Sequence, residues 1–312
     1  MSFSSEAKNE LCRLSPRPCC RRAECYGLLL FGRGFSPAGV SLATANRGVA
    51  RRAAQFAAEV TGAVMEVLPP RPRRHGPGVY TARAADPAQA GRVLAALGHT
   101  GREVSLRINL ANLENECCRR AFLRGAFLAC GTAADPGREY HLEYSVPHRN
   151  LANDLFGLMR DILGLDPEPR VSRRGGAYVV YLKGAQRVAD FLTYLGAPDA
   201  AMRLLQVRML KDLRNTVNRQ TNFETANLGK TASAAAGEVL AIQKIKSAGG
   251  FSLLPRELRA LAALRLHHPE LSLRELGQRL SPPLSRSGVH HRLRRILEIA
   301  ERVPGGANLK RS

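Results

Sequence analysis

An internal repeat constrains the fold of this chain more than any other feature of its sequence. Cys19-Cys20-Arg21-Arg22-Ala23 recurs as Cys117-Cys118-Arg119-Arg120-Ala121, at an offset of 98 residues. The same offset aligns Gly27 with Gly125, Leu30 with Leu128, Tyr80 with Tyr178, and Leu97-Gly98 with Leu195-Gly196. Matches at the start, interior and end of a segment are hard to obtain by chance. Residues 19–98 and 117–196 are therefore predicted to be two copies of one structural unit.

Both copies show the same order of helix and strand patterns. In the first copy we predict a first helix over 20–33, an extended segment over 40–45, a middle helix over 49–61 and a later strand over 79–83. In the second copy the corresponding ranges are 117–130, 140–146, 151–163 and 177–182. Turn-rich stretches, Pro69-Pro-Arg-Pro and Arg173-Arg-Gly-Gly, precede the later strands. A last helix runs into each Leu-Gly pair, where glycine suits the left-handed residue that closes a helix. The unit is αββαββα, so residues 1–200 are predicted to form a pseudo-twofold α+β domain with two antiparallel sheets.

The first helix of each copy carries small residues four or five positions apart. Glycine inside a helix costs about 1 kcal/mol relative to alanine, so it is expected where two helix backbones approach closely. The segments from Ala23 to Gly32 and from Ala121 to Gly131 resemble the motif of the LAGLIDADG homing endonucleases. That motif has a helix-packing glycine third, where Gly27 and Gly125 fall, and a metal-binding acid eighth. The resemblance implies that the two helices pack against each other at the pseudo-twofold axis.

The eighth position of that motif is not acidic in this chain. Counting five residues from each glycine gives Gly32 and Cys130, and shifting the first helix by one residue gives Arg33. Two-metal phosphodiester cleavage needs hard oxygen ligands from both helices. The nearest acids, Glu24 and Asp135, lie a turn or more away. The sequence therefore predicts a degenerate domain without nuclease activity, with no catalytic residue.

The cysteines are not spaced like the ligands of a common metal site. They stand at positions 12, 19, 20, 25, 117, 118 and 130, and no C-x-x-C pair is present. We expect free thiols that act as small apolar core residues, with no metal and no other cofactor.

The chain is strongly basic. It has 312 residues with 47 Lys and Arg against 26 Asp and Glu, a formal net charge of +21, while 45% hydrophobic residues exclude wholesale disorder. Such an excess indicates an anionic partner, because cations gain free energy by displacing the counterions of a polyanion. GC-rich coding favours arginine codons and so explains why only 7 of the 47 basic residues are lysine. It does not explain the excess of basic over acidic residues. The N-terminus lacks a signal peptide and no long apolar run is present, so we expect a cytoplasmic protein at the nucleoid, with no membrane or small-molecule partner.

The C-terminal segment combines high charge density with clear helix signals. Residues 251–312 contain 12 Lys and Arg against 5 Asp and Glu. Pro255 can open a first helix, a Ser272–Glu275 capping box starts a second, and Ser285 can cap a third after the turn Ser281-Pro-Pro-Leu. Gly277 is expected where a crossing helix needs room. Residues 251–304 are thus predicted to form a helix-turn-helix domain, followed by a flexible tail, 305–312.

The third helix supplies the predicted DNA-binding residues. A recognition helix enters the major groove of duplex DNA by its N-terminal turn, so base contacts are expected from Arg286, Ser287, His290 and His291. Phosphate contacts are expected from Arg292, Arg294 and Arg295. Ser285 caps this helix, and Gly288 would let it approach the DNA closely. The alternative is a small three-helix bundle whose charged face is merely solvated.

A helical connector is predicted over residues 201–250. The sequence predicts helices joined by a polar bend near Thr221–Lys230. Its four asparagines, at 215, 218, 222 and 227, suit either phosphate contacts or interdomain hydrogen bonds, and the second role is favoured because asparagine more commonly caps and packs.

Taken in order, these features resemble the WhiA family over nearly the whole chain. The resemblance is specific in the connector, at Arg214-Asn215, Asn218-Arg219, Glu224-Thr-Ala-Asn227 and Lys230-Thr231, and in the segment 285–295. It implies a bacterial DNA-binding protein that acts in cell division and chromosome segregation, and in sporulating relatives a transcriptional regulator of division genes. In filamentous relatives it implies an iron–sulfur partner of the WhiB type.

Three functions therefore compete at this point. The first is a DNA-binding regulator that does not cut, the second an active LAGLIDADG-type endonuclease, and the third a basic interaction scaffold. The non-acidic residues Gly32 and Cys130 argue against the second.

Overall fold

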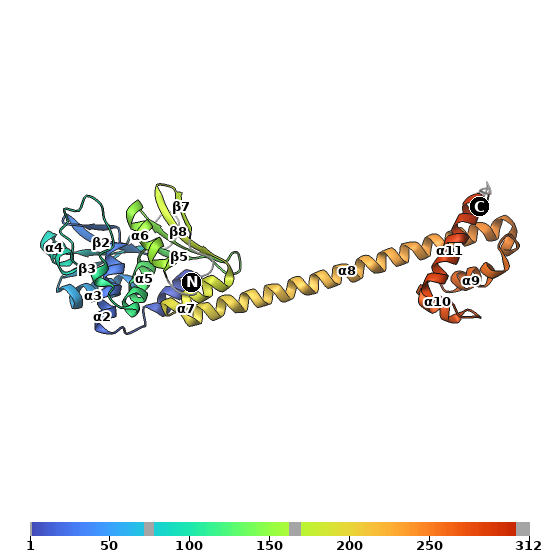
Figure 1. The fold of residues 1–312 in the computed structure, drawn as a ribbon, viewed down its shortest axis with the longest axis horizontal. Coiled ribbons are helices and arrows are strands. Elements are labelled where there is room, and N and C mark those ends of the chain that lie inside the picture. Colours follow the sequence, from blue (N-terminus) through green and yellow to red (C-terminus); the bar gives the residue numbers. More distant parts are fainter. Residues whose placement is uncertain (1, 72–77, 162–169, 304–312) are drawn as a thin grey trace. The chain divides into compact units, whose positions relative to one another are not determined.

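The computed structural model describes residues 2–71, 78–161 and 170–303 (Figure 1). The chain divides into two compact units, residues 1–212 and 213–312. No helix in these described ranges combines the length and the apolar character needed to cross a lipid bilayer. The predicted tail, 305–312, lies outside the described residues.

The first unit contains both copies of the repeat, preceded by a helix, α1 (Phe3–Leu11), that the repeat pattern does not predict. The first copy consists of α2 (Pro18–Leu30), β1 (Gly34–Ser36), β2 (Gly39–Thr44), α3 (Arg47–Thr61), β3 (Met65–Arg71), β4 (Val79–Ala84) and α4 (Pro87–Ala96). A short 3-10 helix, η1 (Leu110–Asn112), precedes the second copy. The second copy consists of α5 (Glu116–Cys130), β5 (Gly131–Ala133), β6 (His141–Val146), α6 (Arg149–Arg160), β7 (Arg170–Arg174), β8 (Ala177–Lys183) and α7 (Ala185–Leu195). The predicted αββαββα order is confirmed in both copies.

Each copy forms one four-stranded antiparallel sheet. The strand orders are β1-β2-β4-β3 and β5-β6-β8-β7, so the two sheets have the same topology. Gly98 and Gly196, which follow the last helix of each copy, have φ of 74° and 103°. This confirms their predicted left-handed conformation. The first unit is the predicted α+β duplication.

Helices α2 and α5 pack against each other through their glycines. A Cβ atom on Gly27 would lie 2.2 Å from the backbone oxygen of Phe122, and one on Gly125 would lie 2.2 Å from the backbone oxygen of Glu24. Real Cβ atoms essentially never approach other atoms so closely. The backbones therefore touch at these two reciprocal positions, as the LAGLIDADG resemblance implies.

Two predictions about the first unit are wrong. Pro69 and Pro70 do not form a turn but lie in β3, an edge strand with a register shift between Leu68 and Arg71. Proline is tolerated there because an edge strand leaves some N–H positions without a ladder partner. Cys19 and Cys117 are exposed, so they are not apolar core residues, whereas Cys20, Cys25 and Cys118 are buried.

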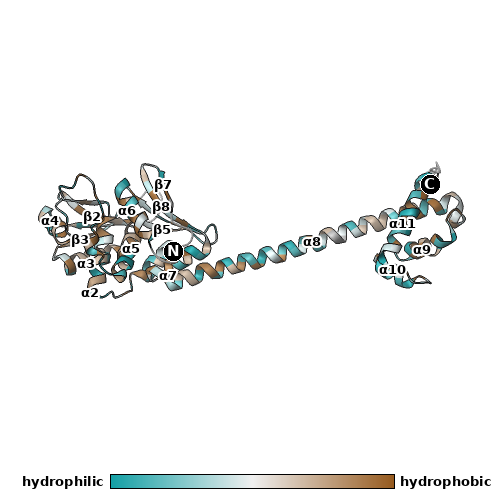
Figure 2. Cartoon of the chain, viewed as in Figure 1, coloured by the Kyte–Doolittle hydropathy of each residue, from teal (hydrophilic) through white to brown (hydrophobic). Residues whose placement is uncertain are grey.

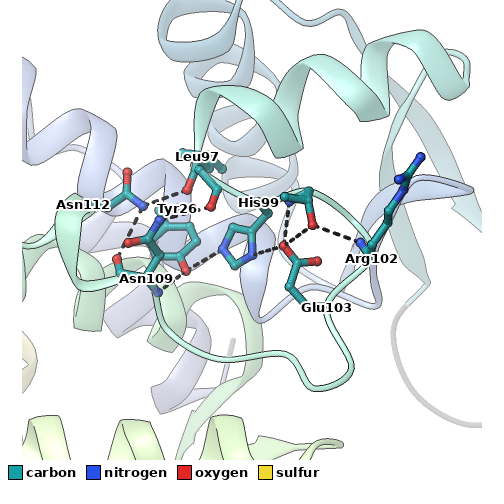
Figure 3. Close-up of polar contacts among 9 residues, drawn as sticks. Tyr26, Leu97, His99, Arg102, Glu103, Asn109 and Asn112 are labelled. Atoms are coloured by element: carbon teal, nitrogen blue, oxygen red, sulfur yellow. Dashed lines mark hydrogen bonds and ion pairs between the residues drawn. The ribbon is translucent and has the colours of Figure 1, made fainter.

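A polar network holds the segment that joins the two copies (Figure 3). The Tyr26 hydroxyl accepts a hydrogen bond from the Asn109 backbone N–H at 2.7 Å, which leaves its own hydrogen for His99 Nε2 at 2.8 Å. His99 Nδ1 lies 3.6 Å from the Glu103 carboxylate. The Asn112 side chain donates to the Leu97 carbonyl at 2.9 Å. The joining segment is thereby held against α2 and the end of α4.

The second unit is helical. Helix α8 runs without interruption over Pro198–Gly249 and is followed by η2 (Gly250–Leu253), α9 (Arg256–His267), α10 (Leu273–Arg279) and α11 (Arg286–Arg302). The predicted bend near 221–230 is therefore wrong. This stretch has no proline, and its polar side chains before Asn227 are exposed, so they do not compete for the helical hydrogen bonds.

The core of the second unit joins all four α-helices. Ile242 and Ile245 from α8 pack with Leu258 and Leu261 of α9, with Leu276 of α10, and with Val289, Leu293 and Ile296 of α11. The ribbon of α10 is coloured mostly as hydrophilic in Figure 2, so few of its residues join this core. The final turns of α8 thus support the three C-terminal helices.

The glycine contact generates a stability prediction. We expect Gly27→Ala to lower the free energy of unfolding by about 1–3 kcal/mol or more, because the new methyl group meets backbone atoms that cannot move aside. Urea unfolding followed by circular dichroism measures the change. The matched control is Gly91→Ala in α4, where nothing lies within 4 Å of a new Cβ and helix propensity predicts a gain of up to about 1 kcal/mol. Equal stabilities of the two variants would contradict the close approach of α2 and α5.

The His99 network predicts a dependence of stability on pH. Burial lowers the pKa of His99 below its ordinary value of 6.5, and Glu103 partly opposes the shift. The unfolded chain therefore binds a proton more readily, so the stabilisation is complete above pH 6.5 and is lost as the pH falls below it. We expect His99→Gln to flatten this part of the pH–stability curve. His148→Gln, at an exposed position, should leave the curve unchanged, and equal slopes in wild type and His99→Gln would refute the effect.

Candidate nucleic-acid interface

Helices α10 and α11 begin at the predicted caps, whereas α9 begins at Arg256, one residue after Pro255. Ser272 Oγ accepts from the Glu275 backbone N–H at 3.4 Å, and the Glu275 carboxylate accepts from the Ser272 backbone N–H at 2.9 Å. These two bonds form the predicted capping box of α10. At the start of α11, Ser285 Oγ accepts from the Gly288 backbone N–H at 3.2 Å. Each helix therefore starts where its sequence signal lies.

The turn between α10 and α11 depends on Gly277. The Leu284 backbone N–H donates to the Gly277 carbonyl at 3.0 Å, and a Cβ on Gly277 would lie 2.2 Å from the Leu284 backbone oxygen. The same Cβ would lie 3.1 Å from Cγ2 of Val289 in α11, so the expectation that Gly277 makes room for a crossing helix is confirmed. The glycine also makes room for the returning turn, which sets the position of α11 relative to α10.

One face of α11 is buried and the opposite face carries predicted site residues. Val289, Leu293, Ile296 and Ala300 are buried. Ser287, His291 and Arg294 are exposed and lie at helical spacing on the opposite side. Ser285, Arg286, His290 and Arg295 are exposed too, while Gly288 and Arg292 are half-buried. The structure therefore brings the predicted base-contacting residues together at the exposed N-terminal end of α11.

The arginines of α11 differ in what they contact. Arg292 Nη1 donates to the Glu257 carbonyl at 3.0 Å, and Arg295 Nη1 pairs with the Glu257 carboxylate at 2.8 Å. Both side chains thus attach α11 to α9. Among the described residues, Arg294 pairs only with Glu298, at 3.5 Å, in an exposed contact one turn along the same helix. Arg286 makes no hydrogen bond or ion pair with any other described residue, so its guanidinium is free to bind a ligand.

A buried ion pair that the sequence pattern does not reveal supports this unit. Arg265 is 1% exposed, and its Nε donates to the Glu238 carboxylate of α8 at 2.7 Å. Its Nη1 also donates to the Leu271 carbonyl at 2.6 Å, ahead of α10. Burial raises the pKa of Glu238, while Arg265 and, less strongly, His290 oppose the rise. Arg265 counts in the basic excess of the segment but adds nothing to its surface charge.

The C-terminal end of α5 borders a pocket of about 330 Å³ that α1 and β2 also line, and its described lining contains no acid. Lys8 lies in this pocket with Cys130, and its Nζ donates to the Leu128 carbonyl at 3.1 Å. Burial lowers the pKa of Lys8 to about 8 and raises the pKa of Cys130 to about 12. A lysine and a neutral thiol therefore lie at the end of α5, where the LAGLIDADG motif would place an acid.

The two acids nearest to the eighth positions of the motif, Glu24 and Asp135, make other contacts. The Glu24 carboxylate is completely buried, and it pairs with Arg52 of α3 and, at 2.8 Å, with Arg124 of α5. Asp135 is exposed and accepts from the Gly137 backbone N–H at 2.8 Å. Neither carboxylate lines the pocket at the helix ends.

Comparisons with known proteins agree with this architecture. The model of the WhiA LAGLIDADG-like domain matches residues 119–214, and the model of the WhiA C-terminal HTH domain matches residues 217–300. A protein of Desulforudis audaxviator, named probable cell division protein WhiA, is 40% identical over 309 residues, which cover 97% of this chain and 98% of the relative. A protein of the same name from Alkaliphilus metalliredigens is 37% identical over 98% of this chain and 99% of its own length.

The chain belongs to the WhiA family. Its fold is also that of a solved member, since the crystal structure of full-length WhiA from Thermatoga maritima matches with a TM-score of 0.58. That match covers 97% of this chain and 99% of the other, at 23% sequence identity.

The WhiA HTH match includes every predicted DNA-binding residue, from Ser285 to Arg295. In the connector, Asn215, Asn218 and Asn222 lie exposed on α8, and the side chain of Asn227 lies outside the description. The choice between phosphate contacts and interdomain hydrogen bonds for these asparagines stays a prediction.

Proposed function

We propose that this WhiA-family protein binds duplex DNA through its helix-turn-helix and acts in cell division as a regulator of transcription, without cutting DNA. The observation that carries the proposal is the exposed N-terminal end of α11. There Arg286 and His291 are exposed and make no hydrogen bond or ion pair with another described residue, and the exposed Ser287 hydroxyl contacts only that of Ser285, at 3.0 Å. The resemblance to WhiA proteins extends the proposal to division and sporulation genes and to chromosome segregation.

In the proposed complex, the first turns of α11 enter the major groove. An arginine can donate two parallel hydrogen bonds to the O6 and N7 atoms of guanine, so Arg286 is the strongest candidate for reading sequence. Ser287 and His291, on the adjoining face, would contact neighbouring base edges or sugars. His290 is exposed one residue before His291, and we assign it to the flank of the proposed interface.

Arg294 is the proposed phosphate contact, because its only described ion pair is exposed and weak. Arg292 and Arg295 fix the angle of α11 through Glu257, so their effect on DNA binding would be partly indirect. Of the three arginines for which the sequence predicts phosphate contacts, we therefore assign only Arg294 a mainly direct contact.

The charge distribution favours DNA over a protein scaffold as the partner. The net charge of +21 provides a sequence-independent attraction to any duplex. A scaffold would need no free hydrogen-bonding groups at the start of α11, whereas a DNA reader does. A regulator should bind its own site at least ~10³ times more tightly than random DNA.

DNA binding tests these roles. We expect Arg286→Ala to weaken binding to a cognate site by about 1–3 kcal/mol with little effect on random duplex. Arg294→Ala should weaken both duplexes alike and reduce the slope of log K against log salt concentration by about 1. Fluorescence anisotropy over a range of salt concentrations measures both effects, on a site obtained by genome-wide mapping of bound DNA.

Arg302→Ala serves as the control, because it removes the same charge from the last turn of the same helix. Equal losses on cognate and random DNA from Arg286→Ala and Arg294→Ala would contradict the assigned roles. Binding with no salt dependence and no sequence preference would favour the scaffold function.

The absence of cleavage is part of the same proposal. It is supported by the non-acidic residues Gly32 and Cys130 at the motif positions and by the pocket at the end of α5, whose described lining has no carboxylate to hold Mg²⁺. We expect purified protein to leave supercoiled plasmid intact in Mg²⁺ or Mn²⁺, as measured by gel electrophoresis. Nicking that disappears in Asp135→Asn, at an exposed position, would show an active endonuclease instead.

A location at the nucleoid follows from the proposed binding of chromosomal DNA. The WhiB-type iron–sulfur partner stays a prediction of the family resemblance, and co-purification from a host that contains such a protein would test it.

A further inference from the structure

Four cysteine thiols that are far apart in the sequence lie together in the first unit. Cys19 and Cys20 belong to the first turn of α2, and Cys117 and Cys118 belong to the first turn of α5. Their four Sγ atoms all lie within 4.8 Å of one another, and those of Cys19 and Cys20 are 3.9 Å apart. We call these residues the four-thiol cluster. It is the meeting point of the two Cys-Cys pairs that mark the sequence repeat.

We propose that the four-thiol cluster binds one zinc ion and so ties the two copies of the repeat together. A tetrahedral zinc ion with Zn–S bonds of about 2.3 Å holds its sulfur atoms about 3.8 Å apart. The observed spacing thus needs a contraction of only about 1 Å or less to reach this geometry. A [4Fe–4S] cluster, in which each thiolate binds a different iron atom, needs its thiolates farther apart.

The helix ends at the cluster suit the negative charge that such a site carries. Four thiolates and one Zn²⁺ have a combined charge of −2. Neither α2 nor α5 has a side-chain cap at its N-terminus. The backbone N–H groups of these first turns that have no carbonyl partner are therefore available to sulfur, and the helix dipoles favour anionic ligands.

The burial of the thiols also suits a structural ion. Cys20 and Cys118 are buried at 8% and 3% exposure, while Cys19 and Cys117 are exposed. An ion can therefore reach the cluster from solvent and be shielded on its inner side. Four protein ligands leave no open position, as in structural rather than catalytic zinc sites.

The proposed zinc site would join a different part of the two helices from the part that the glycine contact joins. Gly27 and Gly125 join the two helices a further two turns along, and a bound ion would join their first turns. Spacing within one segment does not reveal this site, because each segment supplies only two adjacent ligands. The inference is independent of DNA binding, so either proposal can fail without the other.

Metal analysis of the full-length chain tests the inference. The protein is prepared without an affinity tag or chelator, under anaerobic conditions with a non-thiol reductant, and is then supplied with zinc and dialysed. We expect elemental analysis to find one zinc ion per chain, and fewer than about 0.1 in Cys19→Ser/Cys117→Ser. These two positions are exposed, so circular dichroism should show the variant folded. Cys130→Ser, a thiol at the opposite end of α5, is the matched control and should keep its zinc.

Two further measurements complete the test. Cobalt in place of zinc should give the thiolate-to-metal charge-transfer bands of a tetrahedral sulfur site in the wild type and in Cys130→Ser only. A chelator should lower the midpoint of thermal unfolding of the wild type but not of Cys19→Ser/Cys117→Ser. Zinc content that is equal in all three proteins, no zinc in the folded wild type, stoichiometric iron in its place, or disulfides among the four cysteines in the anaerobic sample would overturn the proposal.

Discussion

Two helix backbones in the first unit meet at a distance that only glycine allows. Because Gly27 faces the backbone of α5 and Gly125 faces the backbone of α2, the two copies of the repeat are held in a fixed, reciprocal orientation. Each copy then builds its own antiparallel sheet with the same strand order. The same contact brings the first turns of the two helices together at one end and their last turns at the other. The thiol cluster is a consequence of this packing.

A buried charge holds the helices of the first unit together. Glu24 is completely buried between Arg52 and Arg124 and connects three helices. Removing one partner of such a group leaves an uncompensated buried charge, which typically costs 3–5 kcal/mol. The carboxylate therefore has a structural role that is incompatible with binding a metal at the helix ends. The ammonium of Lys8 near Cys130 makes the region still less suitable for a cation.

The second unit divides its arginines between packing and surface. Arg265 is buried against Glu238, and Arg292 and Arg295 are held by Glu257, so these three side chains support the helices themselves. Arg286 and the polar residues that follow it remain at the exposed start of α11. The count of basic residues is therefore a poor measure of the DNA-binding surface. The position of each guanidinium relative to its acidic neighbours is the better one.

The sequence by itself determined the duplication, the order of helices and strands, and the caps at Ser272 and Ser285, because these signals depend on residues a few positions apart or on a constant offset. It also located the close approach at Gly27 and Gly125, since glycine inside a helix needs a reason. It did not determine that α8 is a single helix, that Pro69 and Pro70 fit an edge strand, or that Arg265 is buried. Only the tertiary structure decided that four thiols from two copies meet, and that Arg286 is free while Arg292 and Arg295 are paired. These features depend on contacts between residues that are distant along the chain. A local sequence pattern does not determine which of many possible partners a side chain contacts.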